Sequence, residues 1–202
     1  MSALTFHRVG FIVCCLSLLL AGCGGGSDTS AGTSGGGGGV LPFANIAKLK
    51  LGSQTAEEAA YLGVPAEGEF GILDVNADVV VIQIFDMYCM NCQKDAPEVN
   101  KLFERVEDSD LKDSVKFLGI GKKNTVTEAG IYRKRYEVKF PLLPDPEMKN
   151  VKAIGDEKTP TFIVVELRSR IVMHKRLRLG SVDEMMKEIE KAVVSALTSC
   201  ST

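Results

Sequence analysis

The chain has 202 residues, of which 45% are hydrophobic and 25% charged, and its formal net charge is −2 at pH 7. These values are ordinary for a soluble globular protein, and they exclude the strongly basic surface that nucleic-acid binding requires. We therefore expect no nucleic-acid partner, and enough chain for one domain with its own hydrophobic core.

The first 22 residues have the pattern of a secretory signal peptide. A short n-region precedes an apolar stretch over residues 11–20, which is too short to span a bilayer stably. The segment ends in Leu-Ala-Gly followed by Cys23. This ending resembles the lipobox of bacterial lipoproteins, in which the cysteine is acylated and becomes the mature N-terminus. We therefore predict a signal peptide over residues 1–22 and a lipidated Cys23, with ordinary secretory cleavage near Ala21 as the alternative.

A low-complexity segment follows Cys23 and consists almost wholly of Gly, Ser, Thr and Ala. Such a chain cannot bury enough apolar surface to offset its ordering entropy, so it is expected to act as a random-coil tether. We predict the lipidated residue and tether over residues 23–39 and a folded domain over residues 40–202. Acyl chains would anchor the protein to a membrane of the cell envelope, on its periplasmic or extracytoplasmic side.

Hydrophobic patterning of the remaining chain predicts alternating strands and helices. The run VVVIQIF at 79–85 is continuous, apolar and β-branched, which is typical of a central strand buried on both faces. This order predicts an α/β fold with a partly parallel sheet covered by helices on both faces. The expected elements are a helix at 53–62, strands at 70–75 and 79–85, a helix beginning at the cysteine pair, a strand at 115–121, a helix at 127–136, a rigid loop at 141–146, a brief helix at 148–154, antiparallel strands at 161–167 and 171–177, and a final helix from 181 to about 197.

The six cysteines do not form a disulfide framework. Two leave with the signal peptide, Cys23 is reserved for lipid, and Cys200 stands alone near the end of the chain. The remaining two, Cys89 and Cys92, form a C-x-x-C pair. This is the spacing of redox and metal sites rather than of structural cross-links, which normally join distant segments. A single pair argues against a four-thiolate zinc site, and we predict no resident metal or cofactor.

The C-x-x-C pair lies where a buried strand ends and a helix begins. Cys89 is therefore expected beside the unpaired N–H groups of the helix and the positive end of its dipole, which favour the thiolate and make it the nucleophile. Cys92 follows one turn later, within reach to resolve a mixed disulfide. The sequence thus predicts different roles for the two thiols.

The segment over residues 79–99, VVVIQIFDMYCMNCQKDAPEV, resembles the active-site strand and helix of the thioredoxin superfamily. Pro97 stands where thioredoxins kink this helix, and Thr159-Pro160 resembles the cis-proline that faces the C-x-x-C pair. The resemblance implies a thioredoxin-like fold: a central mixed sheet flanked by helices. It also implies that Thr159 and Pro160 bind substrate.

The stretch between Cys92 and Pro160 is longer than in a minimal thioredoxin. It is similar to that of membrane-tethered reductants of the TlpA type and their AhpC/TSA–redoxin relatives, which implies a helical insertion before the cis-proline strand. The activity that this resemblance implies is thiol–disulfide exchange on the disulfides or dithiols of cell-envelope proteins. We expect it to run in the reducing direction, with a membrane electron donor or acceptor as a second partner.

Several positions near the cysteines depart from the family pattern. Gln83 stands where thioredoxins carry a buried acid, and an amide cannot take up and release a proton at neutral pH. We expect Gln83 to be buried and hydrogen-bonded. The dipeptide Met90-Asn91 lacks the proline common before the second cysteine. Asp86 and Tyr88 flank the site, where the charge of Asp86 either raises the thiol pKa or is simply solvated.

Other functions for the same residues remain open. Cys89 and Cys92, with the thioether of Met90, are soft ligands that suit Cu(I). A thiol peroxidase is a further alternative, although the Pro and Thr that precede the peroxidatic cysteine in peroxiredoxins are missing here. A redox-inactive interaction domain is the last alternative, since fold similarity alone does not establish activity.

Overall fold

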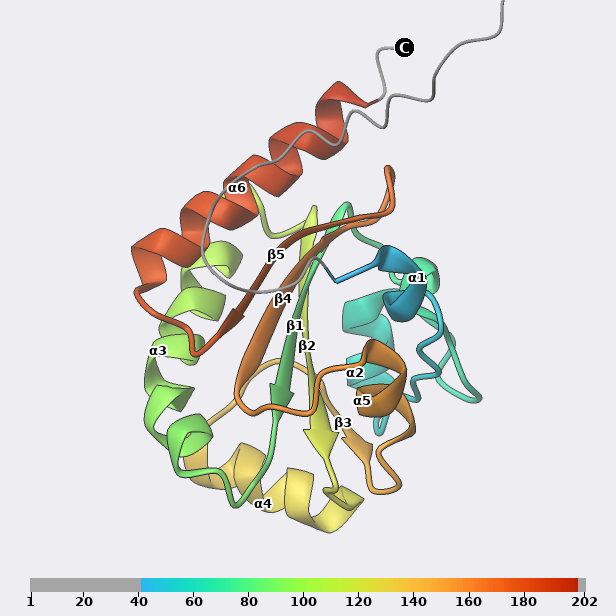
Figure 1. Cartoon of the computed structure of the whole chain (residues 1–202), viewed down its shortest axis with the longest axis vertical. Helices are drawn as coiled ribbons and strands as arrows, with labels where there is room; N and C mark the ends of the chain where they lie inside the picture. The colour runs from blue at the N-terminus through green and yellow to red at the C-terminus, as the bar shows by residue number, and fades with distance from the viewer. Residues whose placement is uncertain (1–40, 200–202) are drawn as a thin grey trace, which may run out of the picture. The chain divides into compact units, whose positions relative to one another are not determined.

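The centre of the fold is a five-stranded mixed sheet with the strand order β3-β2-β1-β4-β5 (Figure 1). The structure, a computed structural model, describes residues 41–199. β1 (Val79–Phe85) pairs in parallel with β2 (Val115–Lys122), and β2 pairs in parallel with β3 (Leu142–Asp145). On the other side of β1, β4 (Thr161–Glu166) pairs antiparallel with β1, and β5 (Ile171–Leu177) pairs antiparallel with β4.

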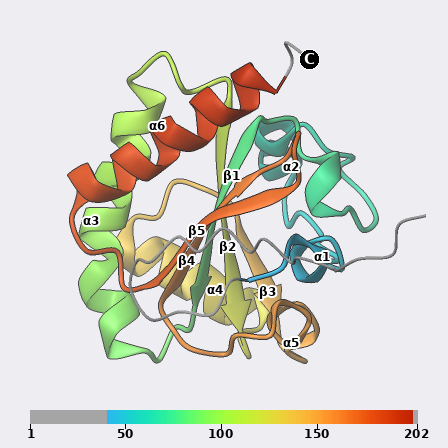
Figure 2. The same ribbon diagram turned by 45° about the horizontal axis from the view of Figure 1, so that its top comes forward.

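Helices cover both faces of this sheet, as the sequence predicted. α3 (Met90–Glu107), α4 (Val126–Tyr136) and α6 (Val182–Thr198) contribute to one hydrophobic cluster. The shorter helices on the other face are α1 (Phe43–Ile46), α2 (Ala56–Leu62) and α5 (Lys149–Ile154). Figures 1 and 2 both show α3 and α6 side by side on one face, with α1 and α5 on the other.

The central strand explains how the two clusters are separated. All seven residues of β1 are buried, and successive side chains of a strand point to opposite faces. Val79, Val81 and Phe85 therefore belong to the cluster with α3, α4 and α6, whereas Val80, Ile82 and Ile84 belong to the other. Gln83 alternates with the first group along the strand, so it points to the face of the sheet covered by α3, the helix that carries the cysteines.

Two of the expected elements differ in the structure. The strand expected at 70–75 is wrong: Phe70 forms an isolated bridge with Leu51, and Ile72–Asp74 is a 3-10 turn. The Asp74 carboxylate accepts a hydrogen bond from the N–H of Gly71 at 2.7 Å, which favours the turn over an extended strand.

The rigid loop expected at 141–146 instead contains the edge strand β3. Leu142 and Leu143 are buried, and Pro144 lies opposite Gly121 of β2. A proline lacks the N–H that a central strand needs, but an edge strand tolerates it because one side of the strand has no partner strand. α4, β3 and α5 lie in the stretch between Cys92 and the cis-proline strand, where the sequence predicts a helical insertion.

No helix within residues 41–199 is both long enough and apolar enough to cross a membrane. The predicted signal peptide at 1–22, the tether at 23–39 with the lipidated Cys23, and the tail residue Cys200 lie outside the described residues.

Candidate active site

The two cysteines lie at the carboxyl end of β1, where the chain turns into α3. Cys89 is the N-cap residue of α3, and its sulfur accepts a hydrogen bond from the N–H of Cys92 at 3.2 Å. The N–H of Cys89 itself donates to the carbonyl of Asp86 at 3.0 Å, which closes the turn between strand and helix. The first thiol therefore occupies the position in which the free N–H groups of the helix stabilise a negative charge.

The two thiols differ in burial and in acidity. Cys89 is half-buried, and although burial acts to raise its pKa, hydrogen bonds from Cys92, Thr159 and nearby backbone N–H groups outweigh this effect and lower the pKa. Cys92 is fully buried, and burial raises its pKa far above the ordinary value. Both cysteines are free thiols. The site therefore presents one accessible, acidic thiol in front of one enclosed, protonated thiol.

The loop that faces Cys89 contains the cis peptide bond predicted between Thr159 and Pro160. The thiol of Cys89 donates to the carbonyl of Thr159 at 3.4 Å. Pro160 is buried, and its carbonyl accepts a hydrogen bond from the N–H of Arg178 at 3.2 Å. The backbone of Thr159 thus lies directly beside the accessible sulfur.

The turn before Cys89 is held by side chains from the turn itself and from the end of β2. The carboxylate of Asp86 accepts from the N–H of Tyr88 at 2.9 Å, so Asp86 is a half-buried turn residue rather than a simply solvated one. Asn124, which is only 1% exposed, accepts from the N–H of Met87 at 2.9 Å. The patterns used for prediction do not single out Asn124, because its role depends on the pairing of β1 with β2.

Two side chains beside Cys89 are exposed. Met90 is 68% exposed, and Tyr88 is 67% exposed although its hydroxyl donates to Glu128 of α4 at 2.8 Å. These side chains, which immediately precede and follow Cys89 in the chain, leave exposed apolar surface near the accessible thiol.

The prediction that Gln83 is buried is confirmed. The residue is 3% exposed. Its amide nitrogen, however, has no hydrogen-bond partner within the part of the chain that the structure describes, so the expectation that Gln83 is hydrogen-bonded is wrong for this atom. The neighbours of Gln83 in the sheet are Gly119 and Phe162, neither of which offers a polar side chain.

A partly buried ion pair, which no sequence pattern predicted, lies one turn of α3 beyond the cysteines. Asp95 follows Cys92 by one turn of α3 and is buried. Arg178, from the segment between β5 and α6, donates to both carboxylate oxygens of Asp95 through Nε and Nη2, at 2.7 to 3.1 Å. The spacing of Asp95 from Cys92 could have indicated the acid. No local pattern indicates its partner.

Pro97 lies within α3, exposed on the surface. A proline there has no N–H for the carbonyl one turn earlier, so the hydrogen-bond ladder of the helix is interrupted near the cysteines.

The hydroxyl of Tyr132, a residue of α4 that is 1% exposed, donates to the carbonyl of Cys92 at 2.9 Å. Tyr132 therefore fixes the first turn of α3 against α4.

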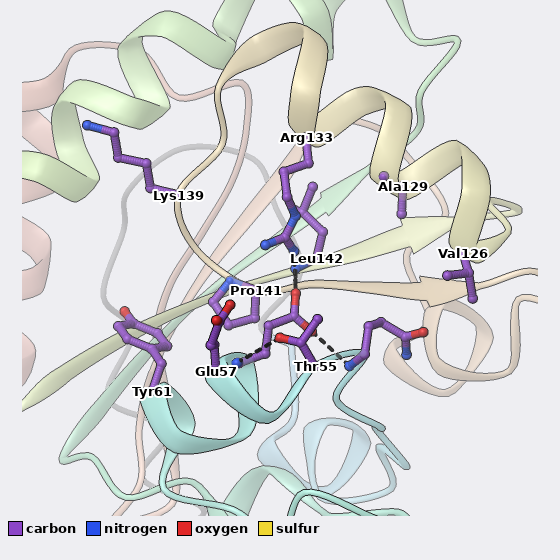
Figure 3. Close-up of a pocket in the computed structure, with 12 residues that line it drawn as sticks. Thr55, Glu57, Tyr61, Val126, Ala129, Arg133, Lys139, Pro141 and Leu142 are labelled. Carbon is purple, nitrogen blue, oxygen red and sulfur yellow. Dashed lines mark hydrogen bonds and ion pairs between the residues drawn. The ribbon is translucent and has the colours of Figure 1, made fainter.

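A cavity of about 510 Å³ lies between α2 and α4, and none of the predicted site residues lines it. Figure 3 shows Arg133 reaching into it from α4. Arg133 pairs with the buried carboxylate of Glu58, which also accepts from the N–H of Gln54 at 2.8 Å. The buried charge of the cavity is therefore already satisfied from within the protein.

The described residues contain no group of three or more His, Cys, Asp or Glu side chains arranged to hold a metal ion. Within residues 41–199, the sulfur-bearing groups near the site are those of Cys89, Cys92, Met87 and Met90. We find no further ligand type converging on the cysteine pair.

Comparisons of the structure with solved structures identify the fold. The chain is similar to DsbF of Mycobacterium tuberculosis, with 17% identity and a TM-score of 0.57 over 74% of this chain and 97% of that one. It is also similar to a secreted M. tuberculosis disulfide oxidoreductase described as homologous to E. coli DsbE, with 14% identity and a TM-score of 0.53 over 73% and 97%. StoA from Bacillus subtilis has 13% identity and a TM-score of 0.53 over 71% and 98%.

At these identities the similarity establishes a thioredoxin-like fold, and the predicted fold class is confirmed. By sequence, no family model matches the chain and no curated protein matches it.

Proposed function

We propose that this protein catalyses thiol–disulfide exchange, with Cys89 as the nucleophile and Cys92 as the resolving thiol. The observation that carries the proposal is the position of the Cys89 sulfur. It lies at the N-cap of α3, accepts the N–H of Cys92 and lies 3.4 Å from the carbonyl of Thr159. The lowered pKa of Cys89 and the raised pKa of Cys92 divide the two roles.

In the reducing direction the chemistry has two steps. The Cys89 thiolate attacks one sulfur of a substrate disulfide, forming a mixed disulfide while the other substrate sulfur leaves as a thiolate and takes up a proton. Cys92 then loses its proton and attacks the Cys89 sulfur, which releases the second substrate thiolate. Two electrons pass to the substrate, whose two thiolates take up one proton lost by Cys92 and one from solvent, and the protein is left with a Cys89–Cys92 disulfide.

The surroundings of Cys89 support a protein substrate. The carbonyl of Thr159 lies 3.4 Å from the sulfur of Cys89, and we propose that Thr159 and Pro160 align an extended substrate segment there. Tyr88 and Met90, the neighbours of Cys89 in the chain, offer exposed apolar surface. Such a surface suits a polypeptide better than a small peroxide.

We further propose that the protein acts as a reductant on cell-envelope proteins and is anchored through a lipidated Cys23. The support for the reducing direction is the long stretch of sequence between Cys92 and Pro160, which resembles that of membrane-tethered reductants of the TlpA type. The support for the anchor is the lipobox-like sequence that ends at Cys23. Disulfide chemistry also suits an extracytoplasmic compartment. A reductant there needs an electron donor in the membrane.

The exchange proposal is tested by trapping the mixed disulfide. Cys92→Ser should retain the attack by Cys89 and accumulate a covalent complex with an unfolded, disulfide-containing protein, reversible by dithiothreitol. Cys89→Ser is the matched control and should form no such complex, because the buried thiol of Cys92 cannot reach the substrate. Absence of a complex with Cys92→Ser, or equal trapping by both variants, would contradict the proposal.

The anchor is tested separately. The wild-type protein should fractionate with membranes when expressed in a bacterium that processes lipoproteins, and Cys23→Ala should be released into the soluble fraction. Continued membrane association of Cys23→Ala would argue against lipidation.

A further inference from the structure

Arg178 contacts three parts of the candidate site at once. Its Nε and Nη2 hold both oxygens of Asp95, and its Nη1 donates to the side-chain oxygen of Asn91 at 3.0 Å. Its backbone N–H donates to the carbonyl of Pro160 at 3.2 Å. Asn91 lies between the two cysteines. One residue therefore connects the C-x-x-C dipeptide, the second turn of α3 and the cis-proline loop.

The backbone of Arg178 indicates that this placement is specific. Arg178 adopts a φ of +66°, in the left-handed region that residues other than glycine rarely occupy. Strained backbone of this kind persists only where the surrounding contacts over-determine it. The side chain is 49% exposed, whereas that of Asp95 is only 10% exposed, so the arginine covers the carboxylate from the solvent side.

Four elements around the cysteine pair supply charged or titratable groups, and those of Tyr132 and Arg178 interact electrostatically with both thiols. Asp86 lies in the turn before α3, Asp95 on α3, Tyr132 on α4 and Arg178 after β5. Tyr132 stays neutral because burial raises its pKa. The pKa of Arg178 is raised by its hydrogen bonds to Asp95, then by the charge of Asp95 and, more weakly, by the charges of the two cysteines. Arg178 is the only cation in this group of four.

We propose that Arg178 is a positioning residue for the exchange reaction: its guanidinium neutralises and immobilises the Asp95 carboxylate one helical turn after Cys92 while holding the side chain of Asn91, the residue that precedes Cys92. This inference rests on the proposed function of the pair. A bidentate arginine–carboxylate pair fixes geometry as well as charge. Without the guanidinium, the buried Asp95 would be left as an uncompensated negative charge one turn of α3 from Cys92, and the cation that interacts with both cysteines would be lost.

The test measures the thiolate of Cys89 directly, in the Cys92→Ser background, by ultraviolet absorbance and alkylation rate as a function of pH. Arg178→Gln removes the cation and should raise the titration midpoint by about half a pH unit, which is roughly a three-fold loss of thiolate below the midpoint. Arg178→Gln combined with Asp95→Asn removes both charges and should return the midpoint toward its original value. Arg178→Lys keeps the charge without the bidentate geometry and should lie in between.

Arg176→Gln is the matched control, because Arg176 belongs to the same hairpin but pairs with the exposed Glu184 of α6 at 3.1 Å. It should leave the midpoint unchanged. The inference is overturned if Arg178→Gln leaves the midpoint in place, or if the double variant shifts as far as the single one. If Arg178→Gln fails to fold, Arg178→Lys decides: an unshifted midpoint overturns the inference.

This readout separates the inference from the proposed function. The titration of Cys89 needs no substrate, whereas trapping of a mixed disulfide by Cys92→Ser tests exchange itself. Successful trapping with a midpoint insensitive to Arg178 would overturn the inference alone. Failure of trapping would contradict the exchange function, whatever Arg178 does to the titration.

Discussion

Gln83 offers a prediction whose sign follows from the structure. Its amide nitrogen is buried without a hydrogen-bond partner among the described residues, and such a group costs about 1–3 kcal/mol of desolvation. Methionine has a similar length and no polar group to desolvate. We therefore expect Gln83→Met to raise the free energy of unfolding by about 1 kcal/mol. For a domain of this size that corresponds to a rise of roughly 2–4 °C in Tm.

The matched control is Gln93→Met, because Gln93 is satisfied: its amide donates to the carbonyl of Met87 at 2.8 Å. The same substitution there should lower the free energy of unfolding by about 0.5–1.5 kcal/mol. Urea denaturation of both variants in the reduced state gives the two values under one set of conditions. If Gln83→Met is as destabilising as Gln93→Met, Gln83 has a polar partner and the reasoning about its burial is refuted.

Three further predictions concern the same region. Gln83→Glu places a carboxyl in this apolar position, where burial raises its folded-state pKa. The variant should therefore lose stability as pH rises through that pKa, and its pH profile of disulfide reduction should differ from that of the wild type. An unchanged profile would exclude proton handling at this position. Tyr132→Phe removes the hydrogen bond to the Cys92 carbonyl and should lower the free energy of unfolding by about 0.5–1.5 kcal/mol in chemical denaturation; no loss would mean that the bond contributes nothing. Because the pKa of Cys89 is lowered, stabilisation from its thiolate is present above the unfolded-state pKa and lost as pH falls through the folded-state pKa. Since the thiolate is the reactive form, iodoacetamide should modify Cys89 well before Cys92 near neutral pH, at a rate that falls on acidification. Equal modification of both cysteines would contradict this assignment.

Local patterns were sufficient to predict the parts of the fold that depend on local physics. The β-branched run of β1 and the cysteines at its end predict a buried strand followed by a helix N-terminus, and the structure has both. The cis Thr159–Pro160 bond was predicted by resemblance alone. In contrast, the strand expected at 70–75 is a turn, because a short apolar segment does not reveal whether a partner strand exists.

The missed features depend on contacts between distant segments. The segment expected as a loop contains β3 because the one proline of that strand, Pro144, is compatible with a strand only at a sheet edge, which is a property of the assembled sheet. The pairing of Arg178 with Asp95 joins residues 83 positions apart. Nothing in the sequence around Arg178 distinguishes it from the exposed basic residues of the same hairpin.

The central claim, that Cys89 and Cys92 form a redox couple, is tested most directly by equilibrating the purified protein with thiol–disulfide buffers of known potential. The account predicts a single reversible two-electron transition that disappears in Cys92→Ser, with a midpoint near or below roughly −250 mV, as expected of a reductant. A midpoint above roughly −180 mV would contradict the reducing direction while keeping the couple. The absence of any reversible transition would contradict the exchange function itself, and Cu(I) binding by the same thiols would then become the leading explanation.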